Sequence, residues 1–175
     1  MGSGSSLFSF FVRQLILVRH AKSDRSDWSV PDVERPLAPR GERDAPVMGQ
    51  RLADRQEGID ALYSSVARRA LDTAGHFAVA LGMDAAEIRL RKGFYTFSPN
   101  DLLRELRELD DSDNRAAVFG HNPATSGVAA YLANEILGDL PTCAVVRLDV
   151  DCGSWRDLGP AVCTLREVDT PKNPA

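Results

Sequence analysis

The 175-residue chain is predicted to form an α/β fold, a three-layer α/β/α sandwich around a mixed and mainly parallel sheet. Two observations predict this fold. Short apolar runs typical of buried strands alternate with longer segments whose apolar residues recur at helical spacing. The chain then ends in two strand-like runs joined by a turn-rich piece, which favours an antiparallel pair at the sheet edge.

The first predicted strand is the aliphatic run at residues 15–18, which is typical of a strand covered on both faces. A long ordered loop rich in Pro, Asp and Arg is expected after it. The helix at the end of this loop is predicted to place Val47, Leu52 and Ala53 on one side. Pro46 must lie in the first turn of that helix or kink it.

The middle of the chain alternates strands and helices. Residues 59–65 are the second predicted strand, and residues 66–83 are predicted to be helical. The apolar residues at helical spacing in that segment are Ala70, Ala74, Phe77 and Leu81. Residues 88–94 are either a further strand or an extended connection. Ser98 is the expected N-cap of the next helix, and Pro99 is its expected first residue.

The last third of the chain adds one more strand and helix before the closing pair of strands. Residues 116–119 are a predicted strand, and the helix after it is expected to have Asn122 as its cap and Pro123 as its first residue. Residues 143–150 and 161–168 are the predicted closing strands.

The chain is expected to hold one domain, at residues 14–168, between a flexible Gly/Ser-rich leader at 1–13 and a flexible tail at 169–175. The formal net charge of -4 argues against a nucleic-acid partner. No apolar run approaches the roughly 20 residues that span a membrane. The three cysteines form no CxxC and are expected to be core residues in a reducing, cytoplasmic compartment.

Cationic and imidazole side chains directly follow three of the predicted strands. Arg19 and His20 follow the first strand, Arg68 and Arg69 follow the second, and His121 follows the strand at 116–119. If these strands are parallel neighbours, their carboxyl ends bring the side chains to one crevice. Two arginines and two histidines around one point predict a site for a phosphoryl group.

The chemistry of phosphoryl transfer explains this choice of residues. Negative charge spreads over the equatorial oxygens of the phosphoryl group, so catalysis is mostly positioning and charge stabilisation. The planar guanidinium of arginine binds two oxygens at once. A neutral imidazole can attack phosphorus, and a second one can donate a hydrogen bond to the oxygens. No HxxxH or HxH is present and the arginines would repel a cation, so no metal or other cofactor is expected.

Three segments resemble the motifs of the histidine phosphatase (phosphoglycerate mutase-like) superfamily. "LVRHAKS" resembles its RHG signature with alanine in place of the commoner glycine, "SSVARRALDTA" resembles its second-arginine segment, and "VFGHNP" its second-histidine segment. The pieces "RHAKS", "RPLAPRGERDA" and "GHNP" are similar to the SixA-type branch, known as phosphohistidine phosphatases. The resemblance runs from about residue 15 to 131 and implies the fold of that superfamily.

The resemblance implies a role for each of the clustered residues. His20 becomes the phosphorylated nucleophile, Arg19 a phosphate clamp, and Arg69 the second clamp, while Arg68 is left as a neighbour on the helix surface. His121 becomes the second histidine.

The sequence departs from the superfamily pattern in the second-arginine segment and in the proton donor. Val66 replaces the usual proline, and Asp72 replaces the usual glutamine. The segment "RKGFYTFSP", where mutases and acid phosphatases of the superfamily carry a carboxylic acid, has no Asp or Glu. A phosphoramidate demands less of an acid than an ester does, because its leaving nitrogen can be protonated before or during departure.

Lys22, Ser23 and Asp24, which follow His20 closely in the sequence, are weaker candidates for the site. Asp24 is a possible substitute proton donor, although a solvated loop carboxylate is the commoner role of an Asp at such a position. Lys22 and Ser23 are candidate substrate contacts, although a lysine after a strand is usually solvated.

The sequence therefore predicts a metal-independent phosphatase that hydrolyses phosphohistidine on a partner protein through a covalent phosphohistidine on His20. One alternative keeps this mechanism with a small phosphate monoester, such as a sugar phosphate or nucleotide, as substrate. An alternative of another class is an inactive phosphate-binding interaction module.

Overall fold

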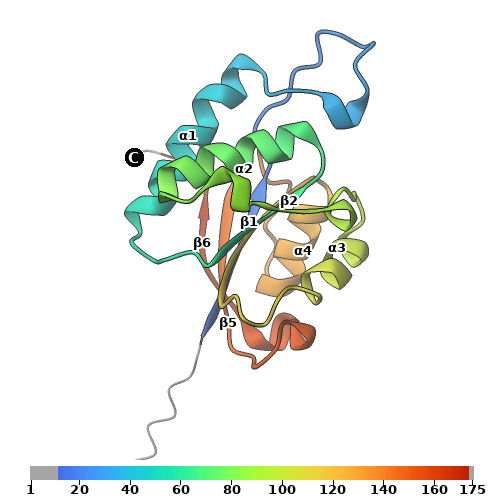
Figure 1. Ribbon diagram of the computed structural model, residues 1–175. Coiled ribbons are helices and arrows are strands. Elements are labelled where there is room, and N and C mark those ends of the chain that lie inside the picture. Colours follow the sequence, from blue (N-terminus) through green and yellow to red (C-terminus); the bar gives the residue numbers. More distant parts are fainter. Residues whose placement is uncertain (1–11, 174–175) are drawn as a thin grey trace, which may run out of the picture.

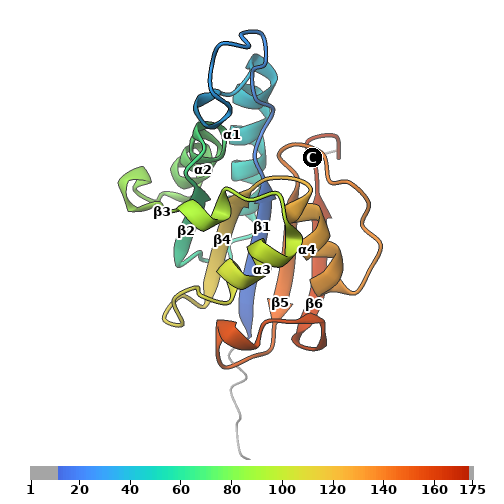
Figure 2. The ribbon, with the colours of Figure 1, turned by 90° about the vertical axis from the view of Figure 1, so that its right-hand side faces the viewer.

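The computed structural model describes residues 12–173 and has the predicted three layers (Figures 1 and 2). Its sheet has the strand order β3-β2-β4-β1-β5-β6. The strands are β1 (Arg13–Arg19), β2 (Ala61–Ser65), β3 (Arg89–Arg91), β4 (Arg115–Gly120), β5 (Val145–Val150) and β6 (Cys163–Asp169). The helices are α1 (Pro39–Asp54), α2 (Arg68–Leu81), α3 (Pro99–Leu106) and α4 (Ala124–Ala133). The first four strands are parallel, whereas β5 and β6 pair antiparallel at one edge.

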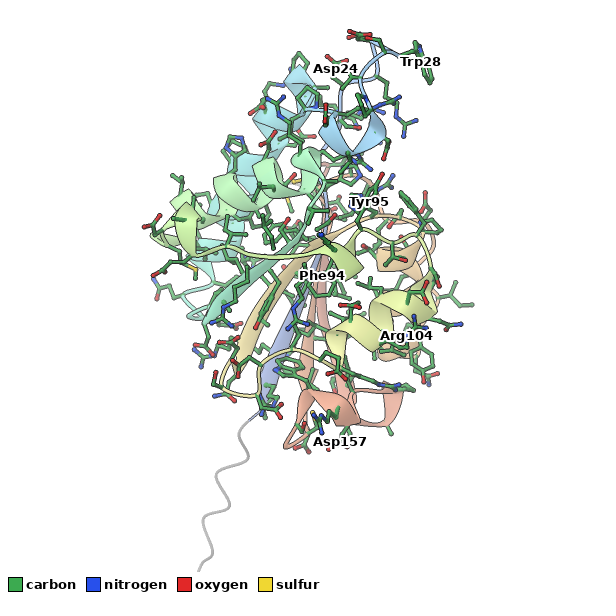
Figure 3. The ribbon with its side chains drawn as sticks, turned by 45° about the vertical axis from the view of Figure 1, so that its right-hand side comes forward. Asp24, Trp28, Phe94, Tyr95, Arg104 and Asp157 are labelled. Carbon is green, nitrogen blue, oxygen red and sulfur yellow. The ribbon has the colours of Figure 1, made fainter. Side chains whose placement is uncertain are left out.

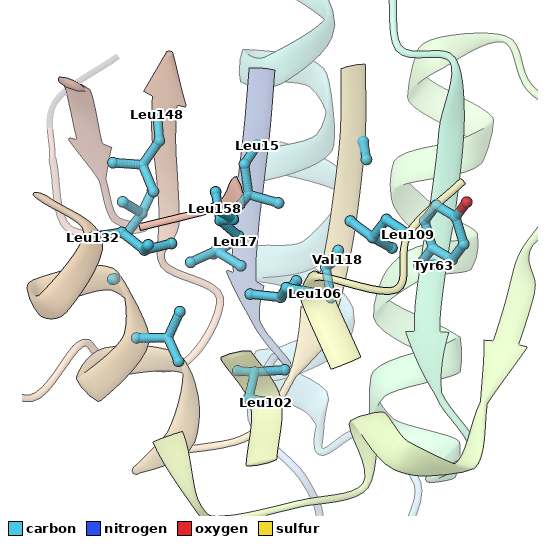
Figure 4. Close-up of a cluster of buried hydrophobic side chains, with 14 of the residues drawn as sticks. Leu15, Leu17, Tyr63, Leu102, Leu106, Leu109, Val118, Leu132, Leu148 and Leu158 are labelled. Atoms are coloured by element: carbon cyan, nitrogen blue, oxygen red, sulfur yellow. The ribbon is translucent and has the colours of Figure 1, made fainter. Parts of the chain in front are cut away.

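The strand β1 lies at the centre of the domain and explains the unbroken aliphatic run in the sequence. Leu15 and Leu17 pack on the face of the sheet that α3 and α4 cover, as Figure 4 shows. Ile16 and Val18 pack on the opposite face, against α1 and α2. Because successive side chains of a strand point to opposite faces, a strand buried on both faces needs apolar residues at every position.

The buried face of α1 differs from the prediction. Its buried residues are Gly41, Ala45, Met48, Gly49 and Leu52. Leu52 therefore faces the core as expected, but Val47 is 49% exposed and Ala53 is only half-buried. Val47 precedes Leu52 by five positions, which places it on the solvent side of a helix with 3.6 residues per turn. Pro46 lies in the middle of α1 rather than in its first turn, on the same exposed side.

The predicted start of α3 is confirmed, while α4 begins one residue later than predicted. Ser98 caps α3 and accepts a hydrogen bond from the backbone amide of Asp101. Pro123, predicted to be the first residue of α4, occupies its N-cap position instead. The side chain of Asn122 still accepts a hydrogen bond from the backbone amide of Ser126, at 3.2 Å.

The two predicted domain boundaries fall within strands β1 and β6. β1 begins at Arg13 and β6 ends at Asp169, so the boundaries predicted at 14 and 168 each fall one residue inside a strand. In the segment predicted as a tail, Asp169, Thr170 and Asn173 accept hydrogen bonds from Arg51 of α1. Most of the predicted leader lies outside the described residues. Within 12–173, no helix has the length and apolar character that crossing a membrane requires.

Candidate active site

The parallel pairing of β1 with β4 brings the two histidines of the sequence motifs together. Arg19 pairs with Gly120 in the register of the two strands, and the backbone amide of His20 donates to the Gly120 carbonyl at 3.0 Å. His121 follows Gly120 directly. The ring centroids of His20 and His121 lie 5.1 Å apart at the carboxyl edge of the sheet, as the strand-end argument predicts.

The hydrogen bonds of His20 fix which ring nitrogen is free to react. Its Nδ1 lies 2.7 Å from the backbone carbonyl of Ala21, which can only accept, so Nδ1 carries the proton. Nε2 therefore keeps its lone pair and accepts a hydrogen bond from Nε of Arg69 at 3.3 Å. This tautomer leaves His20 Nε2 as an unprotonated nucleophile facing a guanidinium.

Arg69 lies between the two histidines and is almost fully buried. Its Nη2 lies 3.4 Å from Nδ1 of His121, while its Nε faces His20. Thr73, one turn further along α2, donates to the Arg69 carbonyl at 2.6 Å and accepts from the backbone amide of Ala21 at 3.0 Å. Thr73 thus ties the first turn of α2 to the end of β1 and holds Arg69 beside His20.

Both histidines are neutral at pH 7. Burial above all, together with the charges of Arg69 and Arg19 and against the effect of the Ala21 carbonyl, lowers the pKa of His20 to about 4. Burial likewise lowers the pKa of His121 to about 3, assisted by repulsion from His20 and Arg69. His121 Nε2 bonds to Ser65 Oγ at 2.8 Å at the end of β2. His20 is therefore uncharged at neutral pH, with its proton on Nδ1 and a lone pair on Nε2.

Arg19 points toward the loop that precedes β5. Its Nη1 donates to the Leu140 carbonyl and lies 3.8 Å from a carboxylate oxygen of Asp139. Its Nε is buried and has no hydrogen-bond partner within residues 12–173. A buried N–H without a partner is costly, so Arg19 keeps one unused hydrogen-bond donor.

Asp32 and Tyr95 complete the site and were not among the predicted residues. Asp32 starts a short 3-10 helix (Asp32–Glu34), and its Oδ2 accepts hydrogen bonds from Arg69 Nη2 at 2.9 Å and from Tyr95 Oη at 2.7 Å. The backbone carbonyl of Asp32 also accepts from Arg69 Nη1, at 2.5 Å. The rings of Tyr95 and Phe97 pack edge-on or tilted against His121, with centroids 5.4 and 5.6 Å away.

Asp32 gave little signal in the sequence. It follows no strand, and a carboxylate in a loop rich in Pro, Asp and Arg has the composition of a solvated surface. Tyr95 lies in the segment "RKGFYTFSP", where the sequence shows only the absence of a carboxylic acid. The positions of the proline and charged residues in this loop do not reveal that the loop folds back and places Asp32 at the carboxyl end of the sheet.

The weaker candidates lie along the same loop, further out. Ser23 is buried and bridges to Leu37, whereas Lys22 is exposed. Asp24 lies in the outer part of the loop with Trp28, away from Tyr95 (Figure 3). Hydrogen bonds from Ser26 lower the pKa of Asp24, which keeps it ionised at neutral pH. These observations do not favour Asp24 as a proton donor.

Arg68 and His76 of α2 contact acidic side chains at the surface, away from the site. Arg68 is exposed and forms an ion pair with Asp72, 3.5 Å apart and one turn along the helix. His76 pairs with Glu42 of α1 at 2.8 Å. Among residues 12–173, the structure groups no three His, Cys, Asp or Glu side chains as a metal site.

Comparison with known proteins identifies the family of this site. Residues 15–95 match the family model described as the histidine phosphatase superfamily, branch 1. The chain belongs to the histidine phosphatase superfamily. An uncharacterised protein of Mycobacterium tuberculosis is 33% identical to this chain over 165 residues, covering 89% of the chain and 100% of the relative.

Two further comparisons show the range of this superfamily. A 2,3-bisphosphoglycerate-dependent phosphoglycerate mutase of Mycobacterium bovis is 27% identical over 187 residues, and the match covers 82% of this chain and 74% of the mutase. The solved structure of the protein histidine phosphatase SixA with tungstate superposes with a TM-score of 0.75 at 18% identity, covering 90% of this chain and 97% of that one. That structural match confirms the predicted fold.

Proposed function

We propose that this histidine phosphatase hydrolyses phosphohistidine on a partner protein, without a metal, through a covalent phosphohistidine on His20. One observation carries the proposal. His20 is buried, keeps its proton on Nδ1, and presents an unprotonated Nε2 to the guanidinium of Arg69. An imidazole in this state is a nucleophile at neutral pH, and a guanidinium beside it holds the phosphoryl group that it attacks.

The proposed reaction has two steps. Arg69 and the unpartnered Nε of Arg19 bind the phosphoryl oxygens, and His20 Nε2 forms a bond to phosphorus as the substrate bond breaks. Water then attacks the phosphoryl group on His20, and inorganic phosphate leaves. His121 lies 5.1 Å from His20, ring to ring, and lines the same phosphoryl site.

We propose a substrate with a P–N bond because neither carboxylate near the site is placed to protonate the leaving group of an ester. Asp24 is held by its own loop, and Asp32 is ion-paired with Arg69, so neither is placed as a carboxylic acid that protonates an alkoxide. Similarity to the protein histidine phosphatase SixA supports the same substrate. Similarity to a phosphoglycerate mutase favours the alternative of a small phosphate ester with the same chemistry at His20.

The test compares turnover of a phosphohistidine-bearing protein with turnover of a panel of small phosphate monoesters, at neutral pH with a chelator present. We expect a clear preference for the P–N bond and no loss with the chelator. Efficient hydrolysis of the esters instead would support the small-molecule alternative. Tight binding of phosphate without any turnover would support the inactive binding module.

A further inference from the structure

Asp32 borders the site and leaves one of its two carboxylate oxygens free. Its Oδ2 is occupied by Arg69 and Tyr95, at 2.9 and 2.7 Å. Its Oδ1 has no hydrogen-bond partner in the described part of the chain, and the side chain is 48% exposed. Arg69 and Tyr95 thus hold the carboxylate in place while its other oxygen can accept a hydrogen bond from a bound molecule.

The position of Asp32 relative to Arg69 matches the side from which a leaving group departs. The Nε of Arg69 faces the nucleophilic Nε2 of His20, whereas its Nη1 and Nη2 face Asp32. In a phosphoryl transfer the attacking and leaving atoms lie roughly in line, on opposite sides of phosphorus. Asp32 contacts Arg69 at the Nη end of the guanidinium, away from the Nε that faces His20, so a leaving group that departs on this side comes within reach of its free Oδ1.

Asp32 is ionised at neutral pH. Burial alone raises the pKa of its carboxyl group, but hydrogen bonds from Tyr95 and Arg69, together with the charges of Arg69 and Arg35, lower the pKa overall. The other titratable groups near it, His20 and His121, are neutral at pH 7. A carboxylate in this state is a poor proton donor and instead stabilises a nearby positive charge.

A phosphoramidate is the substrate class that gains from such a charge. When the second ring nitrogen of phosphohistidine is protonated, the ring carries a positive charge. As His20 Nε2 bonds to phosphorus, the P–N bond breaks and its electron pair stays on the departing nitrogen. The proton on the other nitrogen makes the product a neutral imidazole, so no further acid is needed. Phosphate esters of sugars or glycerate have no such cation.

We propose that Asp32 is a specificity-determining residue that accepts a hydrogen bond from the protonated leaving group and so favours phosphohistidine over phosphate esters. This inference rests on the proposed function and names what selects its substrate. Tyr95 holds the carboxylate by its hydroxyl, and its ring is held in turn by edge-on packing against Phe97 and His121.

The experiment measures kcat/KM for a phosphohistidine peptide and for phenyl phosphate and 3-phosphoglycerate, with the wild type and the Asp32→Asn variant. Losing one charge-assisted hydrogen bond is expected to lower kcat/KM on the peptide roughly tenfold. On the two esters it should fall by a clearly smaller factor, because their leaving groups carry no cation and lose only the support that Asp32 gives to Arg69. Tyr95→Phe should change the ratio in the same direction, by less.

Glu34→Gln is the matched control, because Glu34 belongs to the same 3-10 helix, is exposed, and forms no ion pair among residues 12–173. It removes the same charge and should leave both activities unchanged. Equal changes on peptide and esters in Asp32→Asn would overturn the inference, because Asp32 would then act only on Arg69 or on the phosphoryl group.

The two proposals fail in different ways. A wild-type protein that hydrolyses the phosphohistidine peptide, with an Asp32→Asn variant equally selective, contradicts the role of Asp32 alone. A wild-type protein that hydrolyses only the esters contradicts the proposed function and the inference with it.

Discussion

Two clusters of the same three residue types lie in different parts of this protein. Asp113, just before β4, accepts hydrogen bonds from Tyr63 and Arg89. Asp32, at the carboxyl end of the sheet, accepts hydrogen bonds from Tyr95 and Arg69. Composition alone therefore does not separate a structural cluster from a site.

Burial separates the two clusters. In the first, the Asp113 side chain is 7% exposed and the Arg89 side chain 46%. In the second, the order is reversed, with Arg69 at 5% and Asp32 at 48%. A buried carboxylate whose hydrogen bonds are all satisfied by the protein stabilises the fold, because removing one partner leaves a buried polar group unpaired at a cost in free energy. A buried guanidinium whose carboxylate partner is half-exposed lies instead where a phosphoryl group can reach it from solvent.

The largest expected effect tests the catalytic side of this comparison. His20→Ala should lower kcat at least about a thousandfold, because it removes the proposed nucleophile. When the reaction with a radioactive phosphoryl donor is quenched during turnover, the His20→Ala protein should carry no covalent label. His76→Ala is the control, since His76 pairs with Glu42 away from the site. Unchanged hydrolysis in His20→Ala would contradict the covalent mechanism.

The next prediction compares the stability of the two carboxylate clusters. Asp113→Ala should lower the free energy of unfolding by about 2 to 4 kcal/mol, because it leaves the buried Tyr63 hydroxyl without its acceptor. Asp32→Ala should lower it by about 1 kcal/mol or less, since that pair is half-exposed. Urea unfolding measures both. Similar losses in the two variants would remove the distinction between the clusters.

A smaller loss of activity is expected when the guanidinium of Arg69 is replaced by an ammonium group. Arg69→Lys keeps the charge but loses the planar fork that reaches His20 and the phosphoryl group, and should lower kcat/KM roughly 100-fold. Arg68→Lys changes the neighbouring residue on the exposed side of α2 and should leave kcat/KM as it is. Equal values for the two variants would show that Arg69 contributes only charge.

The smallest effect at neutral pH concerns protonation of the histidines. The pKa of His20 is lowered to about 4 and that of His121 to about 3, below the ordinary value of 6.5. Between these values the unfolded chain binds protons that the folded chain does not, so the free energy of unfolding should fall as the pH drops from 6.5 toward 4. An NMR titration of the His20 ring should show no midpoint above pH 5, and a midpoint near 6.5 would contradict the buried, neutral imidazole.

Local signals in the sequence predict most of the fold. The run at 15–18 predicts a strand buried on both faces, and Ser98 predicts the start of α3, because strand pairing and helix capping depend on neighbouring residues. The burial of Val47 was predicted wrongly because several apolar residues of α1 compete to face the core. Only packing against α2 decides which of them do.

The same division applies to the site. The order of residues along the chain was enough to place Arg19, His20, Arg69 and His121 at or just after the ends of strands. Parallel pairing of neighbouring strands then brings His20, Arg69 and His121 together. Tertiary structure alone decided that Arg19 points to the Leu140 carbonyl and that Asp32 folds back to Arg69 and Tyr95. Those contacts join residues far apart in the chain through loops, and the path of a loop depends on the surfaces it packs against rather than on any periodic pattern in its residues.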